Sequence, residues 1–143
     1  QKFFVIVDEA VGTATGTVNL NYHLAEGEVS IDKADFAITT SYEGDSNVKL
    51  QCFPEQKAVM NEVEGWRSTA YRKGVPRKAV ALDVEKKGKD TVRYISVIYP
   101  VKNADNAPKI YASFSNKHFQ EDGVEVTVMI DGKKFNLAAN LQK

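Results

Sequence analysis

The sequence predicts an all-β domain, folded as an antiparallel β-sandwich of two stacked sheets. Apolar and polar residues alternate along most of the chain, as in the segment Val18-Asn19-Leu20-Asn21-Tyr22-His23-Leu24. Alternation with a period of two places one side of a strand in the core and the other in water. Such segments recur at the short spacing typical of sandwiches, and helical spacing of apolar residues is almost absent.

The expected strands follow one another along the whole chain, and the apolar run that opens it stands apart from the rest. The run at residues 3–7 is continuous, which is typical of a central strand covered on both faces. The expected strands are residues 3–7, 18–24, 34–42, 47–53, 58–64, 78–85, 91–100, 109–115, 123–130 and 133–141.

Turn signals join several of these strands. Asp131-Gly132 lies between two alternating segments, and Asp-Gly favours a two-residue hairpin turn because both positions need a positive φ. Residues 86–90 are charged and contain a glycine, so they predict a longer hairpin loop. Residues 102–108, rich in Asn, Asp and Pro, predict a surface connection and not a linker between domains.

Length and composition indicate one globular domain spanning residues 1–143. Hydrophobic residues make up 43% of the chain and charged residues 27%, which argues against disorder. No apolar run approaches the ~18 residues that a transmembrane helix needs, so no membrane span is expected. The 19 basic and 19 acidic side chains cancel, so attraction for a polyanion must come from local clusters, and no nucleic-acid partner is expected.

Motifs that carry catalysis are nearly absent from the sequence. The chain has no Gly-rich phosphate loop, no Ser-centred elbow and no His or Cys cluster with metal-ligand spacing. The single cysteine, Cys52, excludes an internal disulfide and is expected to be a small buried residue and not a nucleophile. Asp83 and Glu85 share one side of a strand, but their neighbours indicate an exposed hairpin. We therefore expect no catalytic residue in this chain.

A basic and aromatic stretch is the strongest candidate for a binding site. Residues 67–78 carry five basic side chains and no acidic one, with aromatic residues interleaved. Cations pair with carboxylate or sulfate groups, and ring faces stack on sugars, so this composition suits an anionic polysaccharide. The alternative is a solvated connection whose two aromatic rings fill the core. The candidate substrate-binding residues are Trp66, Arg67, Tyr71, Arg72 and Lys73.

Three segments together resemble the heparinase II/III-like polysaccharide lyases. They are Phe3-Phe4-Val5-Ile6-Val7-Asp8-Glu9, Asn21-Tyr22-His23-Leu24-Ala25-Glu26-Gly27, and Gly65-Trp66-x-Ser68-x-x-Tyr71. Their order and spacing are similar to those of the C-terminal β-sheet domain of that family, above all in its heparan sulfate lyases, across most of the chain.

The resemblance implies a longer protein, in which an N-terminal α/α toroid and a C-terminal sandwich together hold a uronic-acid polysaccharide. Such enzymes cleave by β-elimination, in which a base removes the C5 proton of the uronate and an acid protonates the leaving oxygen. The family's catalytic groups lie outside the segments that match this chain. The resemblance therefore implies a supporting domain, inactive alone and requiring no cofactor itself, of a bacterial periplasmic or secreted lyase.

The resemblance also implies a divalent metal, calcium or zinc, in the sandwich of the intact protein. Asp8 matches the position of a family ligand, and His23 is a candidate partner on the next strand. The alternatives are a carboxylate that enters a turn and an exposed strand residue. Tyr22 is in phase with apolar residues, so we expect it in the core and not as an acid or base. His118 is expected in an exposed loop.

A function of a different class also fits the sequence. An autonomous carbohydrate-binding module would use the same basic stretch to bind anionic glycans by itself, with an affinity that falls as salt increases.

Overall fold

A computed structural model describes residues 2–116 and 123–140 of the chain. Almost all of the regular structure is β-strand, with one short 3-10 helix, η1, at Ala104–Asn106. No helix in the described ranges is long and apolar enough to cross a membrane. The strands are β1 (Phe4–Ala10), β2 (Gly16–His23), β3 (Val29–Asp32), β4 (Ala37–Thr40), β5 (Asn47–Pro54), β6 (Ala58–Ala70), β7 (Lys73–Lys86), β8 (Val92–Val101), β9 (Ile110–Phe114), β10 (Gly123–Ile130) and β11 (Lys133–Asn140).

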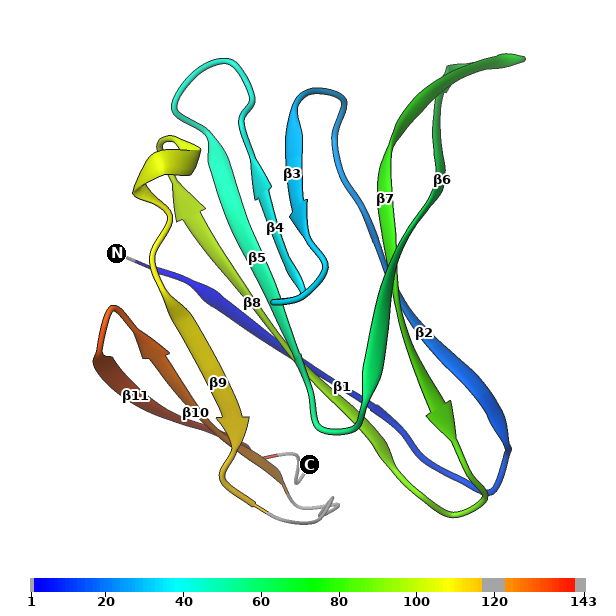
Figure 1. The fold of residues 1–143 in the computed structure, drawn as a ribbon, viewed down its shortest axis with the longest axis vertical. Coiled ribbons are helices and arrows are strands. Elements are labelled where there is room, and N and C mark those ends of the chain that lie inside the picture. Colours follow the sequence, from blue (N-terminus) through cyan, green and yellow to red (C-terminus); the bar gives the residue numbers. More distant parts are fainter. Residues whose placement is uncertain (1, 117–122, 141–143) are drawn as a thin grey trace.

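Hydrogen bonding divides the described strands into three antiparallel sheets. A five-stranded sheet has the order β1-β8-β5-β4-β3, and two three-stranded sheets have the orders β2-β7-β6 and β11-β10-β9. Figure 1 shows the five-stranded sheet between the other two. The predicted all-β, antiparallel sandwich is confirmed. The sequence did not predict the third sheet, because alternation reports a buried face without saying which sheet covers it.

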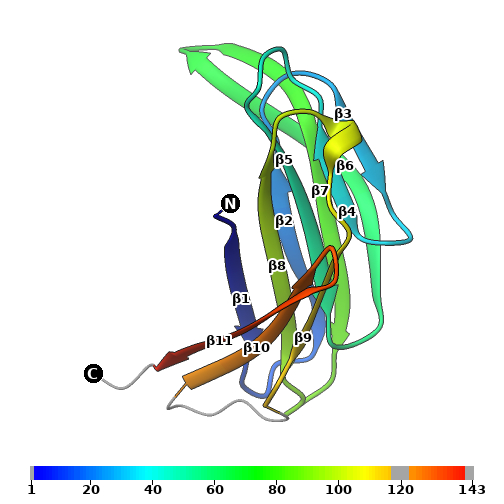
Figure 2. The same ribbon diagram turned by 90° about the vertical axis from the view of Figure 1, so that its left-hand side faces the viewer.

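The five-stranded sheet is buried on both faces because each face packs against a different sheet. Tyr94 on β8 belongs to one core cluster, with Leu82 and Val84 of β7. Its neighbour Ile95 belongs to the other cluster, with Val128 of β10. Successive side chains of a strand point to opposite faces, so β8 supplies both cores. Figure 2 shows the layers from the side.

The structure differs from the prediction around residues 29–42. The strand expected at residues 34–42 is shorter, because a turn precedes β4 and the preceding chain forms β3 against it. The two backbone N–H groups of Ala34 and Asp35 donate to the Asp32 carboxylate, which closes this turn. An Asp side chain that caps its own turn is a common local motif, and the sequence analysis overlooked it.

The first strand is an edge strand, so the prediction of a central strand is wrong. In the five-stranded sheet, β1 pairs only with β8. Val5 and Val7 pack against the second core, whereas Phe4 is 63% exposed and Ile6 is 39% exposed. The apolar run therefore places apolar side chains on both faces of an edge strand. Within the described residues, one of these two faces is left exposed.

The predicted turns are confirmed. Asp131 and Gly132 have φ values of 48° and 80°, as a two-residue hairpin between β10 and β11 requires. Residues between β7 and β8 form a loop, and those between β8 and β9 form a connection that contains η1. His118 lies outside the described residues.

Candidate functional site

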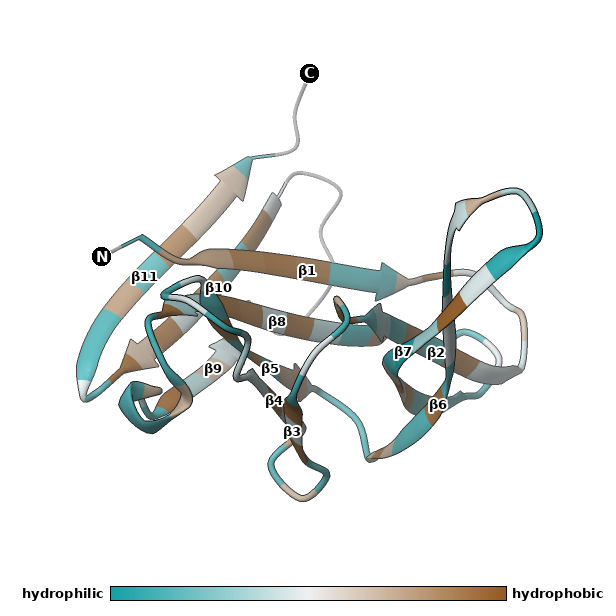
Figure 3. Ribbon diagram, turned by 90° about the horizontal axis from the view of Figure 1, so that it is seen from above, coloured by the Kyte–Doolittle hydropathy of each residue, from teal (hydrophilic) through white to brown (hydrophobic). Residues whose placement is uncertain are grey.

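The hairpin of β6 and β7 extends beyond the sandwich as an arm, defined here as residues 66–77. These two strands are the longest of the described chain, with 13 and 14 residues. Strand β2 pairs with β7 only from Ala79 to Lys86, so the arm has two strands where the rest of its sheet has three. Figure 1 shows the arm projecting away from the other strands. In Figure 3, which is coloured by hydropathy, much of the arm is hydrophilic.

The root of the arm is formed by a close approach of its two strands. A Cβ on Gly65 would lie 2.8 Å from the carbonyl oxygen of Arg77 and 2.9 Å from the Cβ of Ala79. A side chain therefore does not fit at residue 65. The strands predicted at residues 58–64 and 78–85 stop short of the arm, but the pairing of β6 with β7 continues through Gly65 and Pro76 toward the tip.

Trp66 is held in place while much of its ring is exposed to solvent. The side chain is 54% exposed. Its Nε1 donates a hydrogen bond of 2.5 Å to the Glu64 carboxylate, two residues earlier on the same face of β6. The ring also lies over Gly74 of β7, where an added Cβ would be 3.2 Å from Cε3. An indole fixed on one side and open on the other is a platform for stacking.

The tip of the arm presents a second aromatic ring and a cation. Tyr71 is 86% exposed, and the guanidinium carbon of Arg72 lies 5.1 Å from the centre of its ring. Arg72 has a φ of 59°, a left-handed conformation that non-glycine residues seldom adopt. The alternative expectation, in which Trp66 and Tyr71 fill the core, is wrong, because both rings are on the surface.

The basic side chains of the stretch differ in their partners. Arg67 Nη1 lies 3.4 Å from a carboxylate oxygen of Glu26, and Lys78 Nζ lies 3.0 Å from Glu62. The hydrogen bond and charge of Lys78 lower the pKa of the Glu62 carboxyl below its usual value. Within the described ranges, Arg72 and Lys73 form no ion pair with an acidic side chain, so both charges at the tip are available to an anion.

This arrangement suits a linear, negatively charged polymer. The arm brings the five predicted substrate-binding residues onto one exposed hairpin, with aromatic surface along it and uncompensated positive charge at its tip. Guanidinium and ammonium groups bind sulfate and carboxylate, and an exposed indole stacks on a sugar ring. The sequence analysis missed Glu64 and Gly74, which position Trp66. The signal was present, because Glu64 precedes Trp66 by one strand period.

The two predicted metal ligands lie on different sides of the β2-β7-β6 sheet. Asp8 points into the layer between this sheet and the five-stranded one, where burial raises the pKa of Tyr22 and the charge of Asp8 adds a smaller rise. His23 alternates with Tyr22 and Leu24, which face the core, and is exposed on the outer face. Across residues 2–116 and 123–140, no three His, Cys, Asp or Glu side chains form a group suited to a metal ion.

Tyr22 and Cys52 meet in the core beside Ser96. Burial raises the pKa of the Tyr22 phenol to about 12, while a hydrogen bond with Ser96 opposes the shift. Burial likewise raises the pKa of the Cys52 thiol to about 11, and the Ser96 hydroxyl donates to its sulfur at 3.5 Å. Both groups are therefore neutral at ordinary pH. Cys52 is buried in the core and Tyr22 packs against it, half-buried, as the sequence predicted.

Asp83 and Glu85 share the outer face of β7, as predicted, and hydrogen bonds hold both. The Asp83 carboxylate accepts from Asn19 at 2.6 Å and from Asn61 at 3.1 Å, on the strands to either side. Glu85 accepts from Thr17 at 2.5 Å. These bonds run across the three strands as a polar ladder, which stabilises the sheet.

Comparison with known proteins identifies the relatives of this chain. No family model matches. A heparin-sulfate lyase of Bacteroides stercoris is 47% identical over 137 residues, which are 96% of this chain and 21% of that protein. A heparin-sulfate lyase of Bacteroides thetaiotaomicron is 31% identical over 146 residues, covering 99% of this chain and 21% of that protein. This chain thus spans about a fifth of the length of these relatives.

Solved structures agree with the sequence comparison. A heparinase III gene product superimposes with a TM-score of 0.92 at 47% identity, covering 97% of this chain and 22% of that one. A crystal structure of heparinase III also has a TM-score of 0.92, at 30% identity, over 98% of this chain and 22% of that one. The agreement extends over nearly every described strand, so the chain belongs to the heparinase II/III-like lyase family, as a β-sandwich equivalent to about a fifth of its heparinase III members.

Proposed function

We propose that this chain is the supporting β-sandwich of a bacterial heparan sulfate lyase, and that its arm contacts the polysaccharide. The observation that carries the proposal is the match of 96% of the chain to 21% of a heparin-sulfate lyase at 47% identity. Identity at this level over the whole domain supports the same place in a similar larger enzyme. In this proposal the enzyme is periplasmic or secreted, where it meets its glycan.

The chemistry of the proposed lyase comes from outside this chain. β-Elimination needs a base at the uronate C5, a group that neutralises the carboxylate, and an acid for the leaving oxygen. Tyr22, the tyrosine that the family resemblance draws attention to, is half-buried against the core, and its pKa of about 12 is poorly matched to proton transfer near neutral pH. We therefore assign the catalytic groups, together with the metal site to which Asp8 is a candidate contributor, to the intact protein with its helical toroid. His23 lies on the other side of a sheet from Asp8 and does not share that site.

The arm supplies affinity and orientation for the sulfated chain. Arg72 and Lys73 project positive charge at the tip, where sulfate or carboxylate groups have access to both. Trp66 lies further toward the root and offers a ring that Glu64 and Gly74 already hold in position. A pre-positioned ring loses little conformational entropy on binding, so more of its contact energy contributes to affinity.

The test is steady-state kinetics of the intact lyase on heparan sulfate. Replacing Arg72 and Lys73 together by alanine is expected to raise KM several-fold with little change in kcat, because the pair binds the chain away from the reacting atoms. The matched control is the pair Lys133 and Lys134 at the β10–β11 hairpin, which is also basic and exposed. An unchanged KM for the arm variant, or equal effects of the two variants, would contradict the proposal.

An autonomous carbohydrate-binding module is the second candidate, and the exposed, fixed indole of Trp66 favours it. Isothermal titration of this chain with heparan sulfate separates the candidates. A module binds measurably by itself, loses affinity with added salt, and loses it again when Arg72 and Lys73 are replaced by alanine. A supporting domain of a lyase shows weak binding or none in isolation. Elimination activity of the isolated chain would contradict both candidates.

A further inference from the structure

A groove lies between β5 and β9, and no residue of the arm lines it. It has a volume of about 920 Å3, and its other walls are the turn before β4 and the turn between β5 and β6. In Figure 1 the arm projects at the upper right, whereas β9 lies at the lower left. The groove is therefore a separate feature of the surface, which the proposed function leaves unused.

The two long walls of the groove are tied together by side chains. Lys49 of β5 donates from Nζ to the carbonyl oxygen of Pro108, just before β9, at 2.9 Å. The rings of Phe53 on β5 and Tyr111 on β9 meet edge to face, with centroids 6.0 Å apart and planes at 69°. These contacts form the groove before any ligand arrives, and a preformed site loses less entropy on binding.

Tyr111 offers an aromatic platform at the groove. Its side chain is 54% exposed, although Phe53 beneath it packs against the second core. The contact with Phe53 holds the Tyr111 ring by one edge and leaves ring surface open to a ligand. An exposed ring that is already fixed suits stacking on the apolar face of a sugar.

The groove also contains a buried polar group with an unused acceptor. Gln51 is 8% exposed, and its Nε2 donates to the carbonyl oxygen of Asp35 at 3.1 Å. Its Oε1 has no hydrogen-bond partner within the described ranges. A buried acceptor without a donor costs free energy. A hydroxyl of a ligand is a donor of the kind that this oxygen lacks, and a rotation of the amide toward the groove would bring the two together.

Positive charge exceeds negative charge along the groove. Lys57 and Lys109 line it and are exposed, and neither side chain forms an ion pair in the part of the chain that the structure describes. The carboxylate of Glu55, in contrast, lies 3.6 Å from the Arg93 guanidinium. The two free ammonium groups are therefore available to a carboxylate or a sulfate group.

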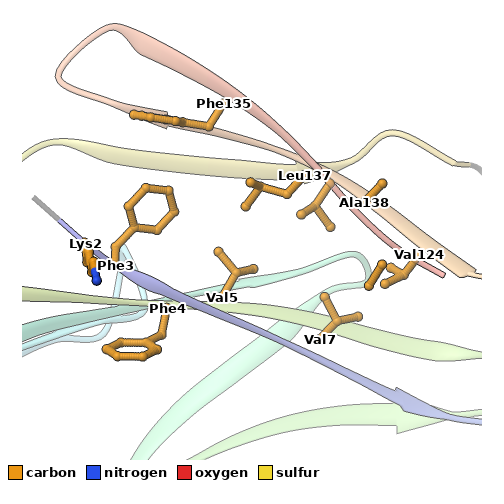
Figure 4. A pocket seen from close by; sticks show the side chains of 11 residues that line it. Lys2, Phe3, Phe4, Val5, Val7, Val124, Phe135, Leu137 and Ala138 are labelled. Atoms are coloured by element: carbon orange, nitrogen blue, oxygen red, sulfur yellow. The ribbon is translucent and has the colours of Figure 1, made fainter. Parts of the chain in front are cut away.

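Another groove, between β1 and the β10–β11 hairpin, differs in its chemistry. Figure 4 shows Phe3, Val5 and Val7 on one side of it, with Phe135 and Leu137 on the other. These side chains offer no hydrogen bonds to hydroxyl groups. Aromatic, polar and cationic groups meet in the groove between β5 and β9, and this combination is the one that an acidic sugar requires.

We propose that the groove between β5 and β9 is a second binding site for an acidic saccharide, with Tyr111 as the platform and Lys57 and Lys109 as the cations. Its use by a lyase rests on the proposed function, whereas the binding itself does not. A long polysaccharide that is held at the groove and at the arm meets the second site at a high effective concentration, so two weak sites together bind it firmly.

Nuclear magnetic resonance of the isotope-labelled chain, titrated with a heparan sulfate tetrasaccharide, tests the proposal. The amides of residues 49–53 and 109–114 are expected to shift together, with one dissociation constant. The same shifts should persist when Arg72 and Lys73 of the arm are both replaced by alanine. An absence of shifts in these two segments at millimolar tetrasaccharide, or their loss in the arm variant, would overturn the proposal. Shifts at residues 66–77 report the arm separately, so failure of one site is distinguishable from failure of the other.

Matched variants identify the groups that bind. Replacing Lys57 and Lys109 together by alanine should weaken binding at the groove about three- to tenfold, as for the loss of two exposed ion pairs. The control replaces Lys87 and Lys89, two exposed lysines of the β7–β8 loop, and should leave the dissociation constant unchanged. Tyr111→Ala should weaken binding through loss of the platform. Equal effects of the two lysine pairs, or equally strong binding of the neutral sugar cellotetraose, would overturn the assignment to an acidic saccharide.

Discussion

Replacing Arg93 by methionine should remove a buried ion pair within the five-stranded sheet and a polar link from that sheet to the end of β9. The Arg93 side chain is 2% exposed, and its Nε donates to the Glu9 carboxylate of β1 at 2.7 Å. Its Nη1 donates to the carbonyl oxygen of Asn116 at 3.1 Å, and its guanidinium carbon lies 3.5 Å from the centre of the Phe114 ring. One side chain thus links β8, β1 and the end of β9.

The size of the effect follows from what the substitution leaves behind. Methionine fills much of the volume of the arginine stem, so the main cost is the Glu9 carboxylate, which is 12% exposed and loses its partner. Breaking a buried ion pair costs about 3–5 kcal/mol, and the remaining exposure of Glu9 favours the lower end, about 3 kcal/mol. With a urea m value of about 1–3 kcal/mol/M, the midpoint should fall by at least about 1 M.

Equilibrium unfolding in urea at pH 7 is the assay, with two further variants. Glu9→Gln in the Arg93→Met background should recover part of the loss, because a neutral amide tolerates the site better than an unpaired charge. Arg67→Met removes an exposed ion pair with Glu26 and should cost no more than about 0.5 kcal/mol. A cost below about 1 kcal/mol for Arg93→Met, or no recovery with Glu9→Gln, would refute this reasoning.

Three further predictions concern the arm and the core. Trp66 is the single tryptophan, so its fluorescence reports on the arm. The added Cβ of Gly74→Ala would press on the Trp66 ring and should shift the emission maximum, with little change in the urea midpoint of unfolding. An unchanged emission spectrum would contradict the contact between Gly74 and the ring. Arg72→Gly relieves the left-handed φ of 59° and should raise stability by up to about 1 kcal/mol, whereas Arg72→Ala should not. Because burial raises the pKa of Cys52 from 9.0 to about 11, the folded state holds its proton longer than the unfolded state, and stability should fall as pH rises from 9 to 11. Cys52→Ala should make that fall shallower in urea titrations at pH 8 and pH 10, and an equal slope would contradict the assignment.

Much of the fold was predictable because alternation is a local signal. The hairpin at Asp131-Gly132 needed only its two turn residues, since positive φ at both positions is specific to that turn. The position of β1 at the sheet edge was not predictable. A run such as residues 3–7 indicates that both faces are apolar, and it does so equally for a central strand and for an edge with a separate cover.

The candidate site was predicted in composition but not in shape. The basic and aromatic character of residues 66–77 was evident, and Gly74 and Pro76 left a solvated connection open as the alternative. In the structure each of these residues has a role within a regular hairpin. Gly65 permits close approach at the root, Gly74 accommodates the indole, and Pro76 lies where β7 has no neighbour on its outer edge, so its missing N–H costs no ladder bond.

The polar clamp of Arg93 shows what sequence patterns miss altogether. Arg93 lies near the start of β8, on the same face as Ile95. Alternation therefore places its side chain toward the core cluster that Ile95 forms with Val128 of β10. From the sequence, a single charged residue at this position predicts an exposed strand end. It is buried because Glu9, Asn116 and Phe114, distant in sequence, converge on it.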